Sequence, residues 1–343
     1  MVERVLITGF TGQVGSQLAE YIINYTDLDV HGLMRWQEQL DNIFDLTDRI
    51  NRKDRVFINY GDLNDANSLR EIIGKLKPKY IFHLGAQSFP RTSFDIPVET
   101  LQTNIIGTAN LLEAVKAISV NSEYDPVVHV CSSSEVYGKA LRGKPIDENT
   151  AFHGASPYSI SKIGTDFLGR YYAEAYGLNT FITRMGTHSG PRRSDVFFES
   201  TVAKQIALIE AGLQPPELRL GNLNSTRTFQ DARDAVRAYY MLAVAAEHGE
   251  FDRGEVFNIA GDEAFHLTDV VTLLLSMSSR DDIVVVEDSD RLRPIDADYQ
   301  LFDNAKIKKT INWSPEISAK DMFKDLLDHW RKLISSGRIP LDR

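Results

Sequence analysis

The chain is 343 residues long, with 43% hydrophobic residues, 25% charged residues and a formal net charge of −10. This composition is typical of a globular protein with a sizeable core, and its acidity opposes general binding to nucleic acid. Since it shows no run of about 20 apolar residues, no secretory leader, no metal-binding motif and only one cysteine, Cys131, we expect a cytoplasmic protein without a membrane span, a disulfide or a structural metal.

The first half of the chain alternates short apolar runs with helix-length amphipathic segments. The runs predict strands at residues 5–8, 30–34, 56–60, 80–84, 127–132 and 180–185. The segments between them predict helices at residues 14–25, 66–76, 98–118 and 158–176. This rhythm is typical of an α/β fold with a Rossmann-like, doubly wound parallel sheet that is covered by helices on both faces.

After residue 186 the rhythm breaks into loops rich in glycine, proline and arginine. Further helices are predicted at residues 200–212, 232–248, 267–275 and 318–336. Residues 257–260 read as a late strand that returns to the first lobe. We therefore expect a Rossmann domain over residues 1–186, with a returning segment near 228–262. Residues 187–343 are expected to form mainly a smaller, substrate-binding lobe over the carboxyl edge of the sheet.

A glycine-rich turn lies between the first predicted strand and the first predicted helix. Gly9, Gly12 and Gly15 fall in a GxxGxxG pattern there. Glycine lets backbone amides and a helix N-terminus approach a pyrophosphate closely, although a tight structural turn would also use it. The residues of this turn predicted to bind a dinucleotide are Gly9, Thr11, Gly12, Gln13, Val14 and Gly15.

The ends of the second and third predicted strands bear on the identity of the dinucleotide. Arg35 stands where an NAD enzyme often presents an acid to the ribose, which favours NADP and leaves NAD as the alternative. Asp62 follows the third strand. Its carboxylate could accept a hydrogen bond from the adenine amino group, or cap a helix.

A candidate catalytic cluster combines a helix with a strand end. Tyr158 and Lys162 are four residues apart, which places them on one face of a helix, and a nearby ammonium would lower the pKa of the phenol. Ser133, Ser134 and Glu135 follow the strand at 127–132, and such carboxyl ends border a cofactor crevice. An ordinary amphipathic helix and a capped turn are the alternative interpretations.

Together these motifs resemble the extended short-chain dehydrogenase/reductase family over nearly the whole chain. Residues 133–139, 188–193 and 220–224, followed by Arg227, look most like the GDP-mannose 4,6-dehydratases within it. The resemblance implies NADP, a GDP-linked sugar, and catalytic roles for Ser133, Glu135, Tyr158 and Lys162. It also implies cofactor contacts from Leu63, Leu84, Gly85, Ala86, Tyr158 and Lys162. The substrate contacts expected are Ser88, Ser134, Thr187, Arg192, Arg227 and Arg293.

The sequence departs from that family at three places. The related dehydratases usually carry Thr at the position of Ser133 and Asn at the position of Thr187. They carry an arginine pair where this chain has Arg35 and Trp36. The first exchange keeps a hydroxyl group, the second bears on the identity of the sugar, and the third bears on the cofactor phosphate and on tetramer contacts.

The extra carboxylate, Glu135, favours a dehydratase. Tyr158 would accept the proton of the sugar 4-hydroxyl during oxidation at C4, and Glu135 would remove the C5 proton so that water leaves from C6. A reductase of a GDP-linked 4-keto sugar or a nucleotide-sugar epimerase needs no such group. A cofactor-sensing regulator needs no catalytic residues at all. These are the alternatives.

Two predictions concern binding partners. Arg192, Arg193, Arg227 and Arg293 are the cations that could hold a pyrophosphate, with Arg227 favoured most and Arg193 least. The apolar stripes of residues 98–118 and 158–176 could pair across a twofold axis in a homodimer or homotetramer. Alternatively, these stripes only face the sheet.

Overall fold

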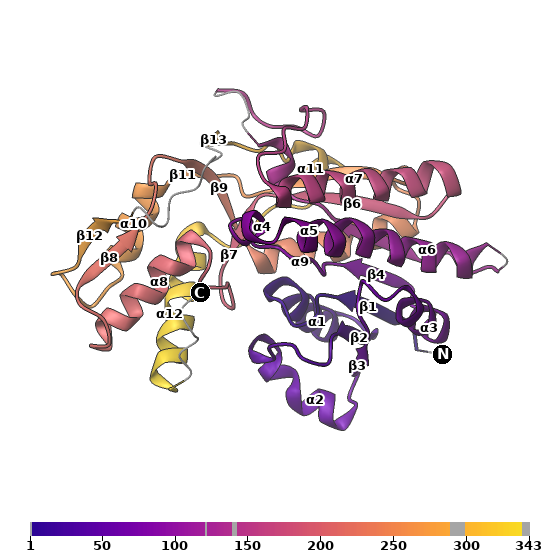
Figure 1. Cartoon of the computed structure of the whole chain (residues 1–343), viewed down its shortest axis with the longest axis horizontal. Helices are drawn as coiled ribbons and strands as arrows, with labels where there is room; N and C mark the ends of the chain where they lie inside the picture. The colour runs from indigo at the N-terminus through magenta and orange to yellow at the C-terminus, as the bar shows by residue number, and fades with distance from the viewer. Residues whose placement is uncertain (1, 121, 139–142, 289–298, 338–343) are drawn as a thin grey trace.

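The chain is described here by a computed structural model covering residues 2–120, 122–138, 143–288 and 299–337. Its centre is a seven-stranded parallel sheet in the order β10-β6-β5-β4-β1-β2-β3 (Figure 1). The strands are β1 (Arg4–Thr8), β2 (Asp29–Met34), β3 (Val56–Tyr60), β4 (Tyr80–His83), β5 (Val127–Cys131), β6 (Thr180–Met185) and β10 (Glu255–Ile259). The predicted Rossmann-like sheet is confirmed.

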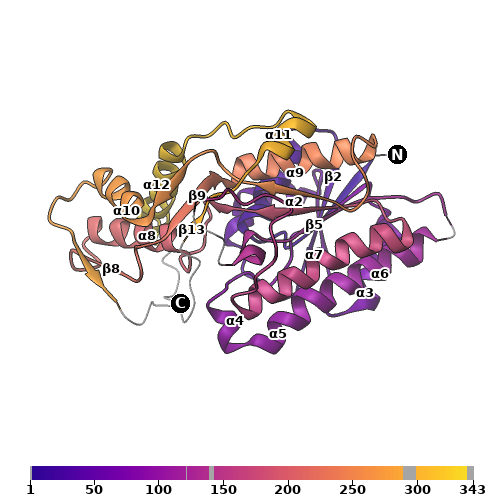
Figure 2. The ribbon, with the colours of Figure 1, turned by 90° about the horizontal axis from the view of Figure 1, so that it is seen from above.

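Helices cover both faces of this sheet. One face carries α1 (Gln13–Tyr25) and α9 (Ala232–Glu247), and the other carries α3 (Ala66–Leu76), α6 (Gly107–Ser119) and α7 (Pro157–Tyr176) (Figure 2). Successive side chains of β1 point to opposite faces, so Ile7 is buried in one core and Leu6 in the other. Burial on both sides explains why the strands read as continuous apolar runs.

The predicted helix at residues 98–118 is interrupted. It consists of α5 (Pro97–Leu101), the π-helical turn η2 (Gln102–Ile106) and α6. Within η2, the side chain of Asn104 accepts from the backbone N–H of Gln87, and its amide donates to the Gln87 carbonyl and to the hydroxyl of Ser161 in α7. The turn therefore ties the loop after β4 to the helix that carries Tyr158.

Several short elements were not predicted, because they lack a clear hydrophobic period. In the first lobe they are η1 (Asp41–Leu46), α2 (Thr47–Arg52), α4 (Thr92–Asp95) and η3 (Ser134–Tyr137). Elsewhere they are α11 (Ala305–Ile311), β7 (Thr187–Ser189), β8 (Glu217–Leu220), β9 (Thr226–Asp231), β11 (Ala264–His266), β12 (Val284–Glu287) and β13 (Tyr299–Gln300).

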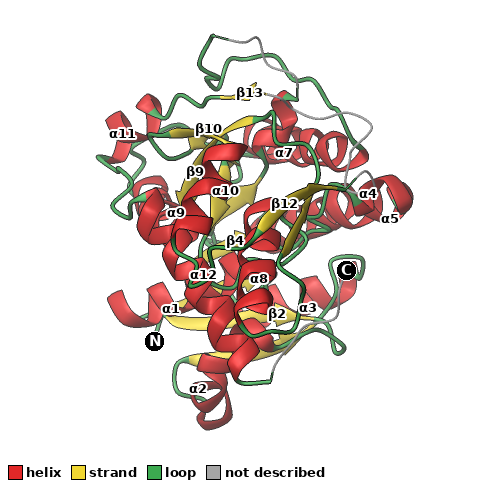
Figure 3. Ribbon diagram, turned by 90° about the vertical axis from the view of Figure 1, so that its left-hand side faces the viewer, coloured by secondary structure: helices red, strands yellow, loops and turns green. Residues whose placement is uncertain are grey.

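The C-terminal lobe has a core of its own. It is built on α8 (Phe198–Glu210), α10 (Leu267–Ser276) and α12 (Ala319–Ser335), which bury Val202, Leu274 and Phe323 among them. These helices lie in front of the sheet in Figure 3. In the predicted returning segment, α9 packs on the sheet and β10 pairs with β6, whereas β9 pairs with β7, β11 and β13. The division at residue 186 and the returning segment near residues 228–262 stay predictions.

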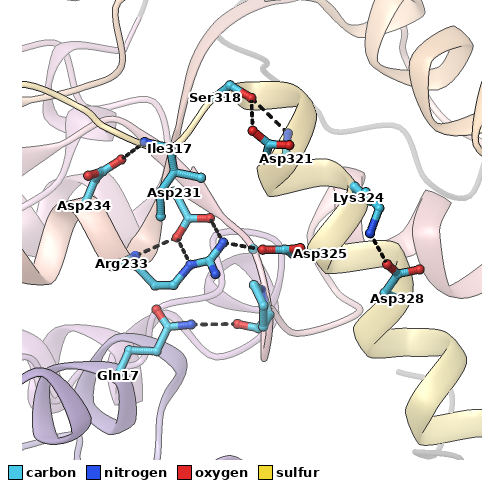
Figure 4. Close-up of polar contacts among 12 residues, drawn as sticks. Gln17, Asp231, Arg233, Asp234, Ile317, Ser318, Asp321, Lys324, Asp325 and Asp328 are labelled. Atoms are coloured by element: carbon cyan, nitrogen blue, oxygen red, sulfur yellow. Dashed lines mark hydrogen bonds and ion pairs between the residues drawn. The ribbon is translucent and has the colours of Figure 1, made fainter. Parts of the chain in front are cut away.

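Ion pairs fasten this lobe to the sheet. The guanidinium of Arg233 at the start of α9 binds Asp231 at 2.8 Å and Asp325 in α12 at 2.7 Å (Figure 4). Asp234 accepts the backbone N–H of Ile317 at 2.9 Å, just before α12 begins. These contacts hold the lobe over the carboxyl ends of the strands. Within the described residues, no helix is long and apolar enough to cross a membrane, and no group of three metal-ligating side chains is present.

Candidate active site

The glycine turn between β1 and α1 is tightly closed. Gly9 adopts a φ of +67°, and a Cβ added at this position would lie 2.8 Å from the backbone nitrogen of Gly85. A Cβ at Gly15 would lie 2.2 Å from the carbonyl oxygen of Gly9. Gly12 is the N-cap of α1 and brings no capping side chain. The turn therefore leaves backbone amides at a helix N-terminus accessible to an anion, as a dinucleotide requires.

A buried histidine joins this turn to the loop after β4. The Thr108 hydroxyl donates to the Asn104 carbonyl, so it accepts from Nε2 of His83 at 2.9 Å. The Thr8 hydroxyl accepts the backbone N–H of Gly85 and donates to Nδ1 of the same ring at 2.9 Å. His83 is therefore neutral, and burial lowers its pKa to about 3.

A cavity of about 1580 Å³ runs along the carboxyl ends of the strands and continues under the C-terminal lobe. Its walls bring together every predicted site residue that the structure describes. On the side predicted for the cofactor they are Gly9, Thr11, Gly12, Gln13, Val14, Gly15, Arg35, Asp62, Leu63, Leu84, Gly85 and Ala86. On the other side they are Ser88, Ser133, Ser134, Glu135, Tyr158, Lys162, Thr187, Arg192 and Arg227.

Two residues of the cofactor group make contacts that the sequence did not indicate. The side chain of Gln13 donates to the carbonyl of Pro191 at 3.1 Å, so it links the glycine turn to the C-terminal lobe. Asp62 accepts the backbone N–H of Asn64 at 2.8 Å, which closes the turn after β3. The residue that caps α3 is Asp65.

Local capping places the two predicted catalytic residues of α7. Ser156 is the N-cap and forms a capping box with Ser159, so Tyr158 falls in the first turn and Lys162 one turn later. The hydroxyl of Ser133 hydrogen-bonds to Tyr158 and also accepts the backbone N–H of Glu135 at 3.1 Å. Ser133, Glu135 and Tyr158 are thereby joined in one cluster.

The expected effect of Lys162 on Tyr158 is not seen. Its ammonium donates to the backbone carbonyl of Cys131 at 2.8 Å. Burial raises the pKa of Tyr158 well above its usual value, and the hydrogen bond with Ser133 offsets only part of this rise. Burial also lowers the pKa of Lys162. Helical spacing places Tyr158 and Lys162 on one face of α7. The ammonium of Lys162, however, donates to the carbonyl at the end of β5.

The candidate anion-binding arginines differ in their surroundings. Arg192 binds Glu20 at 2.6 Å and Asp45 at 3.0 Å, which fastens its loop to the first lobe. The role of Arg192 in substrate binding stays a prediction. Its ion pairs give it a structural role as well. Arg227 extends from β9 into the cavity wall. Arg293 lies outside the described residues.

Arg193, the arginine least favoured from the sequence, is the one whose charge acts on Tyr158. It is buried, it binds Glu199 at 3.0 Å, and its guanidinium lies 3.4 Å from the ring centre of Phe197. Burial lowers the pKa of Arg193, and the charge of Arg193 in turn favours the ionised form of Tyr158. Arg193 lies in the loop between β7 and α8, and local sequence patterns do not predict the conformation of this loop.

Comparison with known proteins identifies a family. The family model described as GDP-mannose 4,6 dehydratase matches residues 6–326. The chain belongs to this family. The GDP-mannose 4,6-dehydratase of Yersinia enterocolitica is 29% identical, over 95% of this chain and 93% of its own. GDP-mannose 4,6 dehydratase 2 of Arabidopsis thaliana is 30% identical, over 98% of this chain and 89% of its own.

Solved structures agree with this fold. RMD from Pseudomonas aeruginosa, solved complexed with NADPH, is 25% identical and superposes with a TM-score of 0.77 over 96% of this chain and 100% of its own. UDP-glucose 4-epimerase of Thermotoga maritima, solved with UDP-glucose, is 24% identical with a TM-score of 0.82, over 96% and 99%. The second likeness supports the fold alone.

One acidic residue of this GDP-mannose 4,6 dehydratase family member was missed in the sequence. Glu38 lies in the loop between β2 and η1 and lines the cofactor side of the cavity. An acid shortly after the second strand is a known signal in Rossmann folds, but Arg35 at the end of that strand pointed to the opposite preference.

Proposed function

We propose that the protein is a nucleotide-sugar 4,6-dehydratase that converts GDP-mannose, or a related GDP-linked sugar, to a GDP-linked 4-keto-6-deoxy sugar. The observation that carries this proposal is the placement of Glu135 beside Ser133 and Tyr158 on one cavity wall. Membership of the GDP-mannose 4,6 dehydratase family supports it, as do full-length relatives that bear this name.

The residues of the glycine turn and of the strand ends beside it fit a nicotinamide dinucleotide, NADP or NAD. The closed turn at Gly9 and Gly15 and the uncapped start of α1 suit its pyrophosphate. RMD, solved with NADPH, supports the same assignment. When bound there, the dinucleotide would supply an acceptor for the hydride of sugar C4 and a source of that hydride for C6.

Tyr158 handles the first proton. Its phenolate form accepts the proton of the sugar 4-hydroxyl as C4 is oxidised to a ketone, and Tyr158 thereby becomes a neutral phenol. Before this step, Ser133 stabilises the phenolate through its hydrogen bond, and the positive charge of Arg193 also favours it. Ser133 and Arg193 oppose the burial that keeps the phenol protonated.

Glu135 handles the second proton. The C4 ketone acidifies the C5 proton, and the carboxylate of Glu135 removes it. The carboxyl group then gives that proton to the C6 hydroxyl, which leaves as water. Glu135 returns to its carboxylate form. Reduction at C6 then takes up one proton at C5, which balances the proton that Tyr158 accepted from the 4-hydroxyl.

The C-terminal lobe supplies the groups proposed to hold the substrate. The guanidinium of Arg227 is the proposed ligand of the pyrophosphate, since it lines the cavity and can make bidentate hydrogen bonds. Ser88, Ser134 and Thr187 lie on the same walls and offer hydroxyl groups to the sugar.

The test is product analysis on a panel of GDP-, UDP-, CDP- and dTDP-sugars without added reductant. The expected result is the loss of one water from a GDP-linked hexose, read by mass spectrometry. Stoichiometric consumption of NADPH would indicate a reductase instead, and an isomer of unchanged mass would indicate an epimerase. Binding of the dinucleotide with no turnover on any sugar would favour a regulator.

Two broader proposals accompany this activity. The first is a homodimer or homotetramer formed through α5, η2 and α7, where Val98, Ile106, Ile160 and Phe167 are exposed. The second is action in the cytoplasm. The single cysteine, Cys131, supports this location, because it rules out an internal disulfide.

A further inference from the structure

The loop after β2 carries a carboxylate into the dinucleotide side of the cavity. One oxygen of Glu38 accepts from Nε of Arg35 at 2.9 Å, and the other accepts from the hydroxyl of Thr11 at 2.8 Å. Thr11 belongs to the glycine turn, and Asn42 donates to its carbonyl at 3.1 Å. Two hydrogen bonds from separate segments therefore fix where this carboxylate lies.

The two partners of the Arg35–Glu38 ion pair differ in exposure. The side chain of Arg35 is 61% exposed, whereas that of Glu38 is 17% exposed. The carboxylate is thus the member held against the protein, and the guanidinium extends outward from it. A phosphate that approached Arg35 from the cavity would meet the negative charge of Glu38 beside it.

Rossmann enzymes tell the two dinucleotides apart at this place. An acid accepts hydrogen bonds from the ribose hydroxyls of NAD, whereas an arginine pairs with the 2′-phosphate of NADP. Here the arginine is already paired with an acid. The 2′-phosphate must take Arg35 from Glu38 and then lie beside an uncompensated carboxylate, while a 2′-hydroxyl can donate to that same carboxylate.

We propose that Glu38 is a specificity-determining residue that shifts this chain from NADP towards NAD, by holding Arg35 and repelling a 2′-phosphate. This assignment rests on the proposed function, because it requires that a dinucleotide binds at the glycine turn. The sequence alone predicted that Arg35 favours NADP, and the proposed role of Glu38 reverses that preference.

The test measures binding without turnover. Protein freed of copurified nucleotide is titrated with NAD and with NADP by calorimetry, and with 5′-ADP and 2′,5′-ADP as probes that cannot react. The wild-type protein is expected to bind NAD at least as tightly as NADP. Glu38→Gln should tighten binding of NADP and 2′,5′-ADP by about tenfold or more, with NAD unchanged or weaker.

Two further variants separate this role from general effects. Asp41→Asn removes the same charge from the same cavity, and within the described residues Asp41 makes no hydrogen bond with Arg35 or Thr11. It should leave the ratio of the two dissociation constants nearly unchanged. Adding Arg35→Met to Glu38→Gln should abolish the gain in NADP affinity, because the freed guanidinium is the proposed phosphate ligand.

Several outcomes would overturn the proposal. They are a wild-type protein that binds NADP more than tenfold tighter than NAD, a Glu38→Gln variant with the wild-type ratio, and an equal loss of both affinities, which would mean that Glu38 only supports the loop. Failure to dehydrate any sugar, with the predicted shift in ratio intact, would refute the proposed function and leave the role of Glu38 standing. Failure to bind either dinucleotide would refute both.

Discussion

Glu135 is the residue on which the proposed elimination depends. It follows Ser133 at the end of β5 and shares a cavity wall with Tyr158. A carboxylate at this place can act on C5 only after C4 has been oxidised, because the ketone provides the acidity of the C5 proton. Oxidation and elimination therefore depend on different side chains and can be separated by substitution.

Glu135→Gln is expected to slow elimination by about 100- to 10,000-fold, since it removes a general base and keeps the side-chain shape. Formation of the reduced dinucleotide in a single turnover should persist. Exchange of the C5 proton with deuterated solvent is the measurement that checks this. As a control, Tyr158→Phe should block both signals. Exchange at the wild-type rate in Glu135→Gln would remove Glu135 from the mechanism.

His83 links acidity to the cofactor loop. Its folded pKa of about 3 lies below the ordinary value of 6.5, so the unfolded chain binds one more proton than the folded chain between those values. The free energy of unfolding therefore falls as the pH falls from 6.5 towards 3. The slope from this residue is about 1.4 kcal/mol per pH unit. Protonation would also cost the hydrogen bond from Thr8 to Nδ1.

His83→Gln is expected to make the free energy of unfolding less dependent on pH between about 6 and 4, by roughly the slope of one histidine. Urea denaturation at a series of pH values measures it. His248→Gln serves as the control, because His248 lies on the surface and is 62% exposed. An identical pH dependence in His83→Gln and the wild-type protein would contradict the assignment.

Among the elements, the β1–α1 connection tolerates little change. Its glycines are required by contacts as well as by φ angles, since the carbonyl oxygen of Gly9 occupies the place of a side chain at Gly15. The same helix also reaches the other lobe, because Gln17 donates to the Pro191 carbonyl at 3.0 Å (Figure 4). A change in the turn would therefore reach both sides of the cavity.

Gly15→Ala is expected to weaken dinucleotide binding by about tenfold to a hundredfold, because the turn must open and move its amides away from the pyrophosphate. Gly74→Ala is the matched control. Gly74 lies inside α3, and a Cβ there would meet only Ile118 at an ordinary 3.7 Å. Calorimetric titration with the dinucleotide should detect a loss in the first variant alone. Equal affinities would show that the turn can adapt.

At the scale of the whole molecule, the two lobes share one cavity but not one hydrophobic core. The core of α8, α10 and α12 is separate from the two cores that flank the sheet. Polar contacts such as Arg233 with Asp325 and Arg192 with Glu20 connect the lobes. The helices α5 and α7 lie with α6 along the lower side of the first lobe in Figure 2, apart from α10 and α12.

Val98→Asp is expected to lower the molar mass in solution towards that of one chain, because it puts a charge on the apolar face proposed to meet a second copy. Val98 is 77% exposed on α5, so the fold of a single chain should tolerate the change. Light scattering after size-exclusion chromatography measures the mass. Leu213→Asp, at an exposed site of the other lobe, is the control. A concentration-independent monomer in the wild-type protein would refute the oligomer.

Local patterns were sufficient to predict much of this protein. The alternation of apolar runs and amphipathic segments predicted the sheet, because residues close in sequence already show which faces are buried. The GxxGxxG turn and the YxxxK spacing predicted where the cavity lies, because each motif is read within one connection or one helix. Every predicted site residue within the described part of the chain lies on the same cavity.

Only the tertiary structure decided how these residues are used. Lys162 binds the Cys131 carbonyl, Arg192 is paired with Glu20, and Glu38 holds Arg35 against Thr11. Most of these contacts join segments that are far apart in the chain, and no periodic pattern encodes which distant group a long polar side chain will reach. Hydrogen bonds and ion pairs depend on a few tenths of an ångström and on local burial, and both are set only when the elements pack.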